Sequence, residues 1–497
     1  MKTLDGPAWN AEGLDRATGR YPLSVERHVM RMAELLVPGV TTVTPHARYY
    51  ALHGLVALEA ERLMLEREQV QDLLRRAEVV VAAVSYFHDH GDDIGLATAH
   101  GTDSILTMLR SPQLDMALAS KPEKPGYVRN VWGFWGPYAA SEVGLRIQVR
   151  TSAPEPGEAC DETALRAGLR DLLQLAREPV LTADDLRGYG HLCVCAGAVS
   201  ADGRWLARLL CGDDRSAESP KSPDATRRET IRLMTRIIDT HEVSCANWDI
   251  TPVLAYGDFL STDRVASDLA VAPVWRGVVL RNYAVGAWRR LWAWLVEQVY
   301  QSDFRVRMED LSDMLAAQMP DCSVAAFLDS LPATSTATGT PRPVERALRE
   351  QSDDSIPVRE LKVLAAGARR VDELDGPVRG AFLGQRGVEL GPEWMALRFD
   401  AARPLPVRDF ARALASDLLA RSQRVALSKA IRNADGTLWL PSRLLERGGY
   451  LFTRSREGSG DVGLRIDQLI MVLAGSGVLR RADGLWKVTP QGQALVD

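Results

Sequence analysis

The sequence has few of the residues that mark secreted and membrane proteins. Only six of its 497 residues are cysteine, and they form neither a CxxC pair nor a zinc-ribbon spacing. No apolar run approaches the ~18 residues of a membrane span. The first residues lack the apolar core of a signal peptide. We therefore expect a cytoplasmic protein with buried free thiols, no membrane contact, no cofactor and no metal.

The familiar catalytic motifs and a strong charge bias are also missing. The chain has no P-loop, no GxSxG nucleophile elbow and no HExxH zinc motif. Its net charge of −5 argues against a general polyanion binder. Residues 406–497 differ, because they hold 14 basic and 9 acidic residues, a net of +5. That local balance is compatible with nucleic-acid contact in the C-terminal part.

Helical periodicity dominates what is present. Apolar residues recur at helical spacing in several segments, and they indicate helices at about 24–36, 45–67, 69–88, 102–110, 161–177, 227–242, 274–300 and 409–431. A short strand is expected at 191–198. Trp288 and Trp292, four residues apart, are expected in a core and not in a ligand cage. The pattern predicts a mainly α, multidomain protein.

Loop composition suggests three consecutive domains. These are a helical N-terminal domain (1–150) with a Pro/Thr loop and an aromatic segment, a mostly helical central domain (151–331) and a C-terminal domain (344–497). Pro332 to Pro343, rich in Ser, Thr and Gly, is the expected boundary between the last two.

The N-terminal part carries a family resemblance. Pro38-Gly39-Val40-Thr41, with Thr44 and Ala47-Arg48-Tyr49-Tyr50, resembles a signature of poorly characterised bacterial proteins from phage-defence gene neighbourhoods. The run Phe134-Trp135-Gly136-Pro137-Tyr138, followed by Gly144-Leu145, is similar to a later part of the same group. The resemblance covers about the first third of the chain. It implies an antiviral setting and no particular chemistry.

Arg48 lies near the expected start of a helix. The unpaired N–H groups and the positive dipole of such a helix end can hold an anion, so Arg48 is a candidate anion ligand. The alternative is that Arg48 pairs with a carboxylate elsewhere, while the threonines serve as helix caps.

The C-terminal residues predict a helix, a hairpin and a helix. A stripe from Leu464 to Leu473 is followed by strands on either side of Asp483-Gly484, a strong hairpin turn, and a helix begins at Pro490. This order resembles the end of a winged-helix domain, about 406–497. The resemblance implies contact with DNA or docking to a protein. The basic residues placed for phosphate contact are Arg465, Arg480, Arg481 and Lys487.

The densest group of possible metal ligands is His88-Asp89-His90, at the end of an expected helix. A His-Asp doublet resembles metal-dependent phosphohydrolases of the HD type, which need further ligands; His53 and Asp103 are available by count. The alternative is a polar loop whose histidines face the negative end of the helix dipole.

Together these observations favour a non-enzymatic component of a bacterial antiviral defence system. We expect it to bind DNA through its C-terminal domain, a partner protein, or both. The alternative is a metal-dependent hydrolase, a phosphohydrolase or nuclease, centred on His88, Asp89 and His90 as catalytic candidates.

Overall fold

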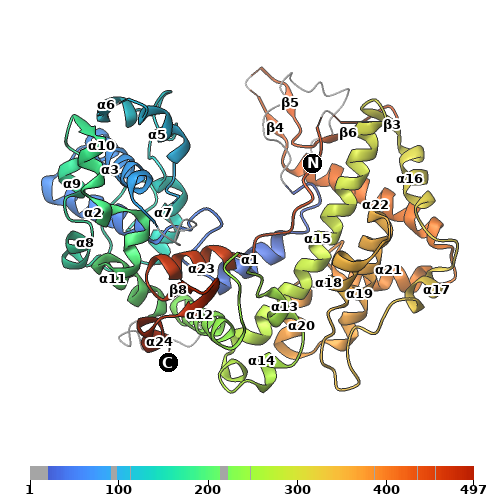
Figure 1. The fold of residues 1–497 in the computed structure, drawn as a ribbon. Coiled ribbons are helices and arrows are strands. Elements are labelled where there is room, and N and C mark those ends of the chain that lie inside the picture. The colour runs from blue at the N-terminus through green and yellow to red at the C-terminus, as the bar shows by residue number, and fades with distance from the viewer. Residues whose placement is uncertain are drawn as a thin grey trace. The chain divides into compact units, whose positions relative to one another are not determined.

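The structure of the chain is a computed structural model that describes residues 21–496, except 91–97, 112, 213–221, 247, 386, 434 and 454. It is mainly helical, as the sequence predicts, and adds small antiparallel sheets (Figure 1). Its contacts define two compact units. We call residues 33–250, 264–271 and 463–497 the terminal unit. The middle unit comprises residues 251–263 and 272–462 and the segment that ends at Met32.

Each unit combines segments that lie far apart in the sequence, whereas the sequence suggests consecutive domains. Position 150/151 falls inside the terminal unit, and residues 406–497 are divided between the units after Val462. The loop expected as a boundary, 332–343, belongs to the middle unit. Its Thr334 is buried and donates a hydrogen bond of 2.5 Å to Glu373. The Ser/Thr/Gly-rich composition that suggested a linker is therefore found in a loop that is hydrogen-bonded to a helix of the same unit.

The terminal unit is built around two long helices, α2 (Ala47–Leu63) and α3 (Arg67–Phe87), which pack against each other. The apolar stripe of α3 explains its burial, and a capping box of Glu66 and Gln69 begins it. The other elements are α5 (Thr102–Met108), β1 (Gln113–Asp115), α6 (Met116–Ala119), α7 (Trp135–Gly144), α8 (Glu162–Gly168), α9 (Leu172–Leu175), β2 (Val180–Thr182), α10 (Ala183–Arg187), η2 (Gly190–Leu192), η3 (Val194–Val199), α11 (Ala201–Cys211), α12 (Pro223–Thr240) and η4 (Ala266–Asp268).

Two expected elements of this unit differ in the structure. The helix expected at 161–177 is split into α8 and α9, because Asp171 adopts a left-handed conformation with φ of 68°. The strand expected at 191–198 is instead the pair of 3₁₀ turns η2 and η3. An apolar run this short does not distinguish a strand from a helical turn.

The middle unit surrounds one long helix, α15 (Val271–Gln301) (Figure 1). Trp288 and Trp292 of this helix are buried, which confirms their expected place in a core. The other elements are α13 (Thr251–Ala255), α14 (Phe259–Thr262), β3 (Arg305–Arg307), α16 (Met308–Ala317), α17 (Val324–Asp329), α18 (Val344–Gln351), α19 (Ile356–Glu373), α20 (Gly376–Leu383), α21 (Pro392–Ala402), α22 (Val407–Ser428), β4 (Ile431–Arg432), β5 (Leu438–Trp439), β6 (Leu444–Arg447) and β7 (Tyr450–Thr453). The helix α1 (Arg27–Leu36) spans the division between the units.

The sheets are small and antiparallel. Within the described residues, the largest sheet has three strands in the order β3-β7-β6. The other sheets are the pairs β1-β2, β4-β5 and β8-β9, where β8 is Leu479–Ala482 and β9 is Leu485–Val488. Among the described helices, none is both long and apolar enough to span a bilayer.

Residues 463–496 fold as the predicted sequence of elements. Helix α23 (Ile466–Gly475) precedes the hairpin of β8 (Leu479–Ala482) and β9 (Leu485–Val488), and α24 (Pro490–Val496) follows. Asp483 and Gly484 both have positive φ, as their turn requires. These elements pack onto α2, η3, α11 and α12 of the terminal unit.

Candidate functional site

Four potential metal ligands from two distant segments meet in the terminal unit. His88 and His90 follow α3, Cys193 lies between the turns η2 and η3, and Cys195 lies in η3. One ligand atom from each residue lies within 4.8 Å of the others. The two sulfur atoms are 3.2 Å apart, and His90 Nδ1 is 3.5 Å from one and 3.7 Å from the other. We call these four residues the His/Cys cluster.

Local backbone geometry explains how the two segments approach. The N–H of His88 still bonds the helix, donating to Val84 O at 3.0 Å, and extended backbone at His88 then turns the chain away. On the other side, the N–H of Val194 donates to Ser85 Oγ at 3.1 Å. Gly190 is required here, because a Cβ atom at this position would lie 2.6 Å from His88 Nδ1.

The polar surroundings of the cluster orient its ligand atoms. His90 Nε2 donates to Ser85 O at 2.6 Å, which leaves Nδ1 as the acceptor nitrogen facing the sulfur atoms. A hydrogen bond from Cys195 outweighs burial and lowers the pKa of the Cys193 thiol to about 6. Asp89 is exposed and is not one of the four ligands.

Arg48 supports the cluster and does not face solvent. Its buried guanidinium donates to Cys193 O at 2.8 Å and to Gly168 O at 2.6 Å, and its Nε lies 3.3 Å from Asp202 Oδ2. Of the two roles considered for Arg48, pairing with a carboxylate is the one observed. The guanidinium is occupied by protein acceptors, so the anion role receives no support.

His53 and Asp103, the ligands available by count, do not join the cluster. Asp103 is exposed on α5. His53 is fully buried between two carboxylates, with its Nδ1 2.5 Å from Glu142 Oε1 and its Nε2 3.1 Å from Glu78 Oε1. The ligand set that the HD resemblance requires is therefore not assembled around His88.

The group of His53, Glu78 and Glu142 forms a sealed hydrogen-bond network. The hydroxyl of Tyr127 and the backbone N–H of Phe134 donate to Glu78, and Trp135 Nε1 donates to Glu142 at 3.1 Å. Burial alone would lower the pKa of His53, but Glu142 and Glu78 outweigh it and raise that pKa to about 9. Burial raises the pKa of Glu142. All three side chains are excluded from solvent, so we assign them a structural role.

The four C-terminal basic residues do not form one surface. Arg465 donates to Val40 O at 3.0 Å, and the Arg481 guanidinium lies 5.1 Å from the centre of the Trp486 ring. Arg480 is exposed and lies opposite Lys487 in the register of the two hairpin strands. Only these two of the four share a sheet face through their register.

The hairpin and its preceding helix are packed against the rest of the terminal unit. The N–H of Cys245 donates to Gly484 O at 2.8 Å, and Trp486 N–H donates to Val243 O at 2.9 Å, which occupies one hairpin edge. Helix α23 is buried along the face that contacts α2 and η3. Its Asp467 accepts a hydrogen bond from Trp248 Nε1 at 3.1 Å.

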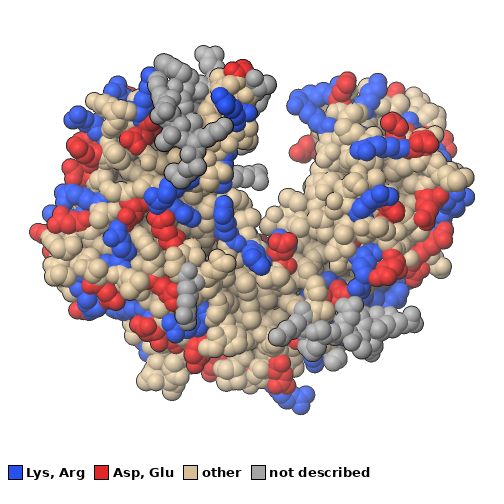
Figure 2. Space-filling model, turned by 180° about the vertical axis from the view of Figure 1, so that it is seen from behind, with Lys and Arg blue, Asp and Glu red and all other residues tan. Residues whose placement is uncertain are grey.

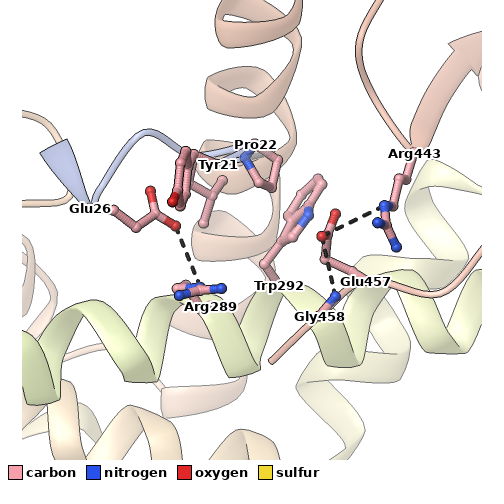
Figure 3. A pocket seen from close by; sticks show the side chains of 9 residues that line it. Tyr21, Pro22, Glu26, Arg289, Trp292, Arg443, Glu457 and Gly458 are labelled. Atoms are coloured by element: carbon pink, nitrogen blue, oxygen red, sulfur yellow. Dashed lines mark hydrogen bonds and ion pairs between the residues drawn. The ribbon is translucent and has the colours of Figure 1, made fainter. Parts of the chain in front are cut away.

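The middle unit contains a polar pocket that the sequence analysis missed. Figure 3 shows Arg289 directed at Glu26 and Arg443 directed at Glu457, beside the Trp292 ring. The cavity has a volume of about 230 Å³. Both ion pairs are long, at 3.6 Å and 3.8 Å, and burial raises the pKa of each carboxyl group. No sequence motif links these residues, which come from four separate segments.

The sheet β3-β7-β6 displays a second feature missed from the sequence. Cross-strand register places Arg305 beside Phe452, and it places Arg307, Tyr450 and Arg447 in one row on the same face. The opposite face buries Val306 and Leu451. We call Arg305, Arg307, Arg447, Tyr450 and Phe452 the arginine–aromatic face. Burial alternates along β3 and β7 but not along β6, so the sequence signal for this face is weak.

Comparison with known proteins adds no assignment. No protein-family model matches the chain, and we found no matching curated protein or solved structure.

Proposed function

We propose that this chain is a non-enzymatic, cytoplasmic component of a bacterial antiviral defence system, and that it binds single-stranded DNA through the arginine–aromatic face. The antiviral setting rests on the resemblance of the Pro38–Tyr50 and Phe134–Leu145 segments. The observation that carries the binding role is the arrangement of arginines and aromatic rings on one exposed sheet face.

The chemistry of this face suits a single strand. Its three arginines are exposed, and both aromatic rings are half-buried. The Arg305 guanidinium lies 3.7 Å from the centre of the Tyr450 ring and 5.4 Å from that of Phe452. Guanidinium groups bind phosphate, and both aromatic rings and guanidinium planes stack on unpaired bases. A duplex keeps its base faces stacked inside, so it can offer such a face its phosphates but no base face for stacking.

The charge on the side drawn in Figure 2 is compatible with a local site. On the side seen in Figure 2, basic and acidic side chains are interspersed, without a large field of one sign. The two cross-strand rows of the arginine–aromatic face hold three arginines and no carboxylate. These rows therefore offer a polyanion a local positive site.

The winged-helix resemblance supports a docking role better than a groove-reading role. A reading helix must expose one face to the major groove. The apolar face of α23 is buried, and its other face presents Asp467, Gln468 and Met471, none of which is basic. We propose that a partner protein, if the system has several components, contacts this part of the chain.

The hydrolase alternative receives less support. A hydrolytic zinc site keeps one coordination position open for water, whereas His88 and His90 face two cysteine sulfurs that complete a set of four.

Binding of the full chain to labelled single-stranded DNA, measured by fluorescence anisotropy between about 50 and 200 mM salt, tests the proposal. The triple variant Arg305→Gln, Arg307→Gln, Arg447→Gln should flatten the salt dependence by about two units, since each lost phosphate contact removes roughly 0.7 on a single strand. The matched control is Arg480→Gln, Arg481→Gln, Lys487→Gln, which changes the charge equally and should keep the slope.

A second variant separates stacking from charge. Tyr450→Leu should weaken binding by roughly 1–3 kcal/mol at an unchanged salt slope, because stacking is independent of counterion release. Failure of the wild-type chain to bind at about 50 mM salt would reject the role. A larger loss in the hairpin triple variant than in the sheet variant would move the site to the hairpin. A preference for RNA over DNA of the same sequence would reassign the ligand.

A further inference from the structure

We propose that His88, His90, Cys193 and Cys195 bind one zinc ion as a structural site of the terminal unit. The site would fasten the end of α3 to the turns η2 and η3, which lie about 100 residues further along the chain: His90 and Cys193 are 103 positions apart.

The spacing of three of the four ligand atoms, those of His90, Cys193 and Cys195, is close to that of a tetrahedral site. Zinc bonds of about 2.3 Å to sulfur and about 2.0 Å to nitrogen place neighbouring ligand atoms roughly 3.5–3.8 Å apart. The observed separations are 3.5 Å and 3.7 Å between His90 Nδ1 and the two sulfur atoms, and 3.2 Å between the sulfur atoms. The sulfur atoms would have to move apart by about half an ångström. The ligand atom of His88, which lies within 4.8 Å of the other three, would have to approach them to the same spacing.

The groups around the cluster hold its ligands as metal sites do. A metal-bound histidine usually donates its other N–H to a carbonyl or carboxylate, which fixes the ring and its tautomer. His90 does so through Ser85 O. The backbone on the cysteine side is fixed as well, since Arg48 donates to Cys193 O and Ser85 accepts from the N–H of Val194. His90 and the backbone that carries the cysteines are therefore positioned before a metal arrives.

The donor set selects the metal and the type of site. Two thiolates with two imidazoles in a tetrahedral arrangement are typical of zinc. Four protein ligands fill the coordination shell, so water has no position and the ion serves structure. This role is independent of the proposed DNA binding, whose residues belong to the middle unit.

Metal analysis of the full chain, purified under reducing conditions without chelators, tests the site. We expect about one zinc per chain, and less than about 0.1 in Cys193→Ser or His90→Ala. Two matched controls should keep the zinc. They are His191→Gln, beside the cluster but outside the ligand set, and Cys322→Ser, a free cysteine of the middle unit.

Cobalt binding keeps the proposal testable if the variants fail to fold. Wild-type chain stripped of metal and reduced should take up one Co²⁺ per chain, with the intense visible bands of tetrahedral coordination and a thiolate charge-transfer band. Added zinc should displace the cobalt and abolish both kinds of band. Weak bands of octahedral type would overturn the proposal. So would a chain purified with a Cys193–Cys195 disulfide that takes up no metal once the disulfide has been reduced. Equal loading with iron or nickel would overturn the choice of zinc.

Discussion

The terminal and middle units place their polar chemistry differently. In the terminal unit, His53, Arg48 and the cysteine pair are enclosed by protein partners. In the middle unit, the arginines of the sheet β3-β7-β6 remain exposed beside aromatic rings. A buried polar group costs free energy unless it is fully paired, so its partners determine stability. An exposed arginine costs little free energy and can be reached by a ligand. The first arrangement maintains a fold, and the second provides a surface.

The largest effect should come from breaking the buried network of the terminal unit. Glu142→Ala leaves His53 Nδ1 and Trp135 Nε1 without their acceptor in a site that excludes solvent. We expect a loss of about 3–5 kcal/mol in the free energy of unfolding, measured by urea denaturation. The control is Glu158→Ala, whose exposed carboxylate lies 3.2 Å from Arg146 and should contribute less than about 1 kcal/mol. Equal effects of the two variants would contradict the structural role of the network.

A comparable loss in the middle unit should come from its apolar core. Trp288 is buried on α15 and donates to Leu390 O at 2.9 Å. Trp288→Ala should therefore cost about 3–5 kcal/mol. Trp294→Ala on the same helix removes a half-exposed ring and should cost clearly less. If Trp288→Ala unfolds at the wild-type urea concentration, the buried position is incorrect.

The helices could be predicted because their signals are local. The stripe of α3, the tryptophans of α15 and the Asp483-Gly484 turn each need only neighbouring residues to specify them. The helix-hairpin-helix order at the C-terminus was found in the same way. What these elements pack against was not predictable, since the pattern that indicates a buried face does not name the element that covers it.

The sites depend on residues that are distant in sequence. His53 and Glu142 are 89 positions apart, and His90 and Cys193 are 103 apart. Spacing motifs capture ligands on one turn or one loop, so a histidine pair and a cysteine pair from separate segments give no joint signal. One signal was available: Glu78 interrupts the apolar stripe of α3, and a carboxylate at a core position indicates a buried partner.

The pH dependence of unfolding should distinguish the two units further. The folded pKa of His53 is about 9, above its ordinary value of 6.5. The stability that this group contributes is therefore complete below about pH 6.5 and is lost as the pH rises toward 9. The raised pKa of Glu142 acts in the same direction. At roughly 1.4 kcal/mol per pKa unit, the loss is on the order of 3 kcal/mol.

Urea unfolding of the wild type and of His53→Gln measures this effect. The measurements should run from about pH 6 to about pH 9, which brackets the range in which His53 titrates. The variant should be less stable at pH 6 and should show a flatter decline toward pH 9. Parallel curves for the two proteins would mean that His53 is neutral in the fold.

The smallest effect should come from the pocket of the middle unit, where the ion pairs are loose. Burial raises the pKa of Glu26, although Arg289 opposes the change at 3.6 Å. A carboxyl group whose folded pKa is raised destabilises the fold once the pH exceeds its unfolded pKa, because the folded state then has to bury the charge. Glu26→Gln removes that charge at similar volume, and Arg289 retains partial access to water. The variant should therefore unfold at a slightly higher temperature than the wild type at pH 8, and the difference should shrink toward pH 5. Calorimetry at the two pH values decides the sign of the stability difference between the variant and the wild type. A variant that is less stable at pH 8 would show that the ion pair outweighs the cost of burial. The pocket would then resemble the paired interior of the terminal unit.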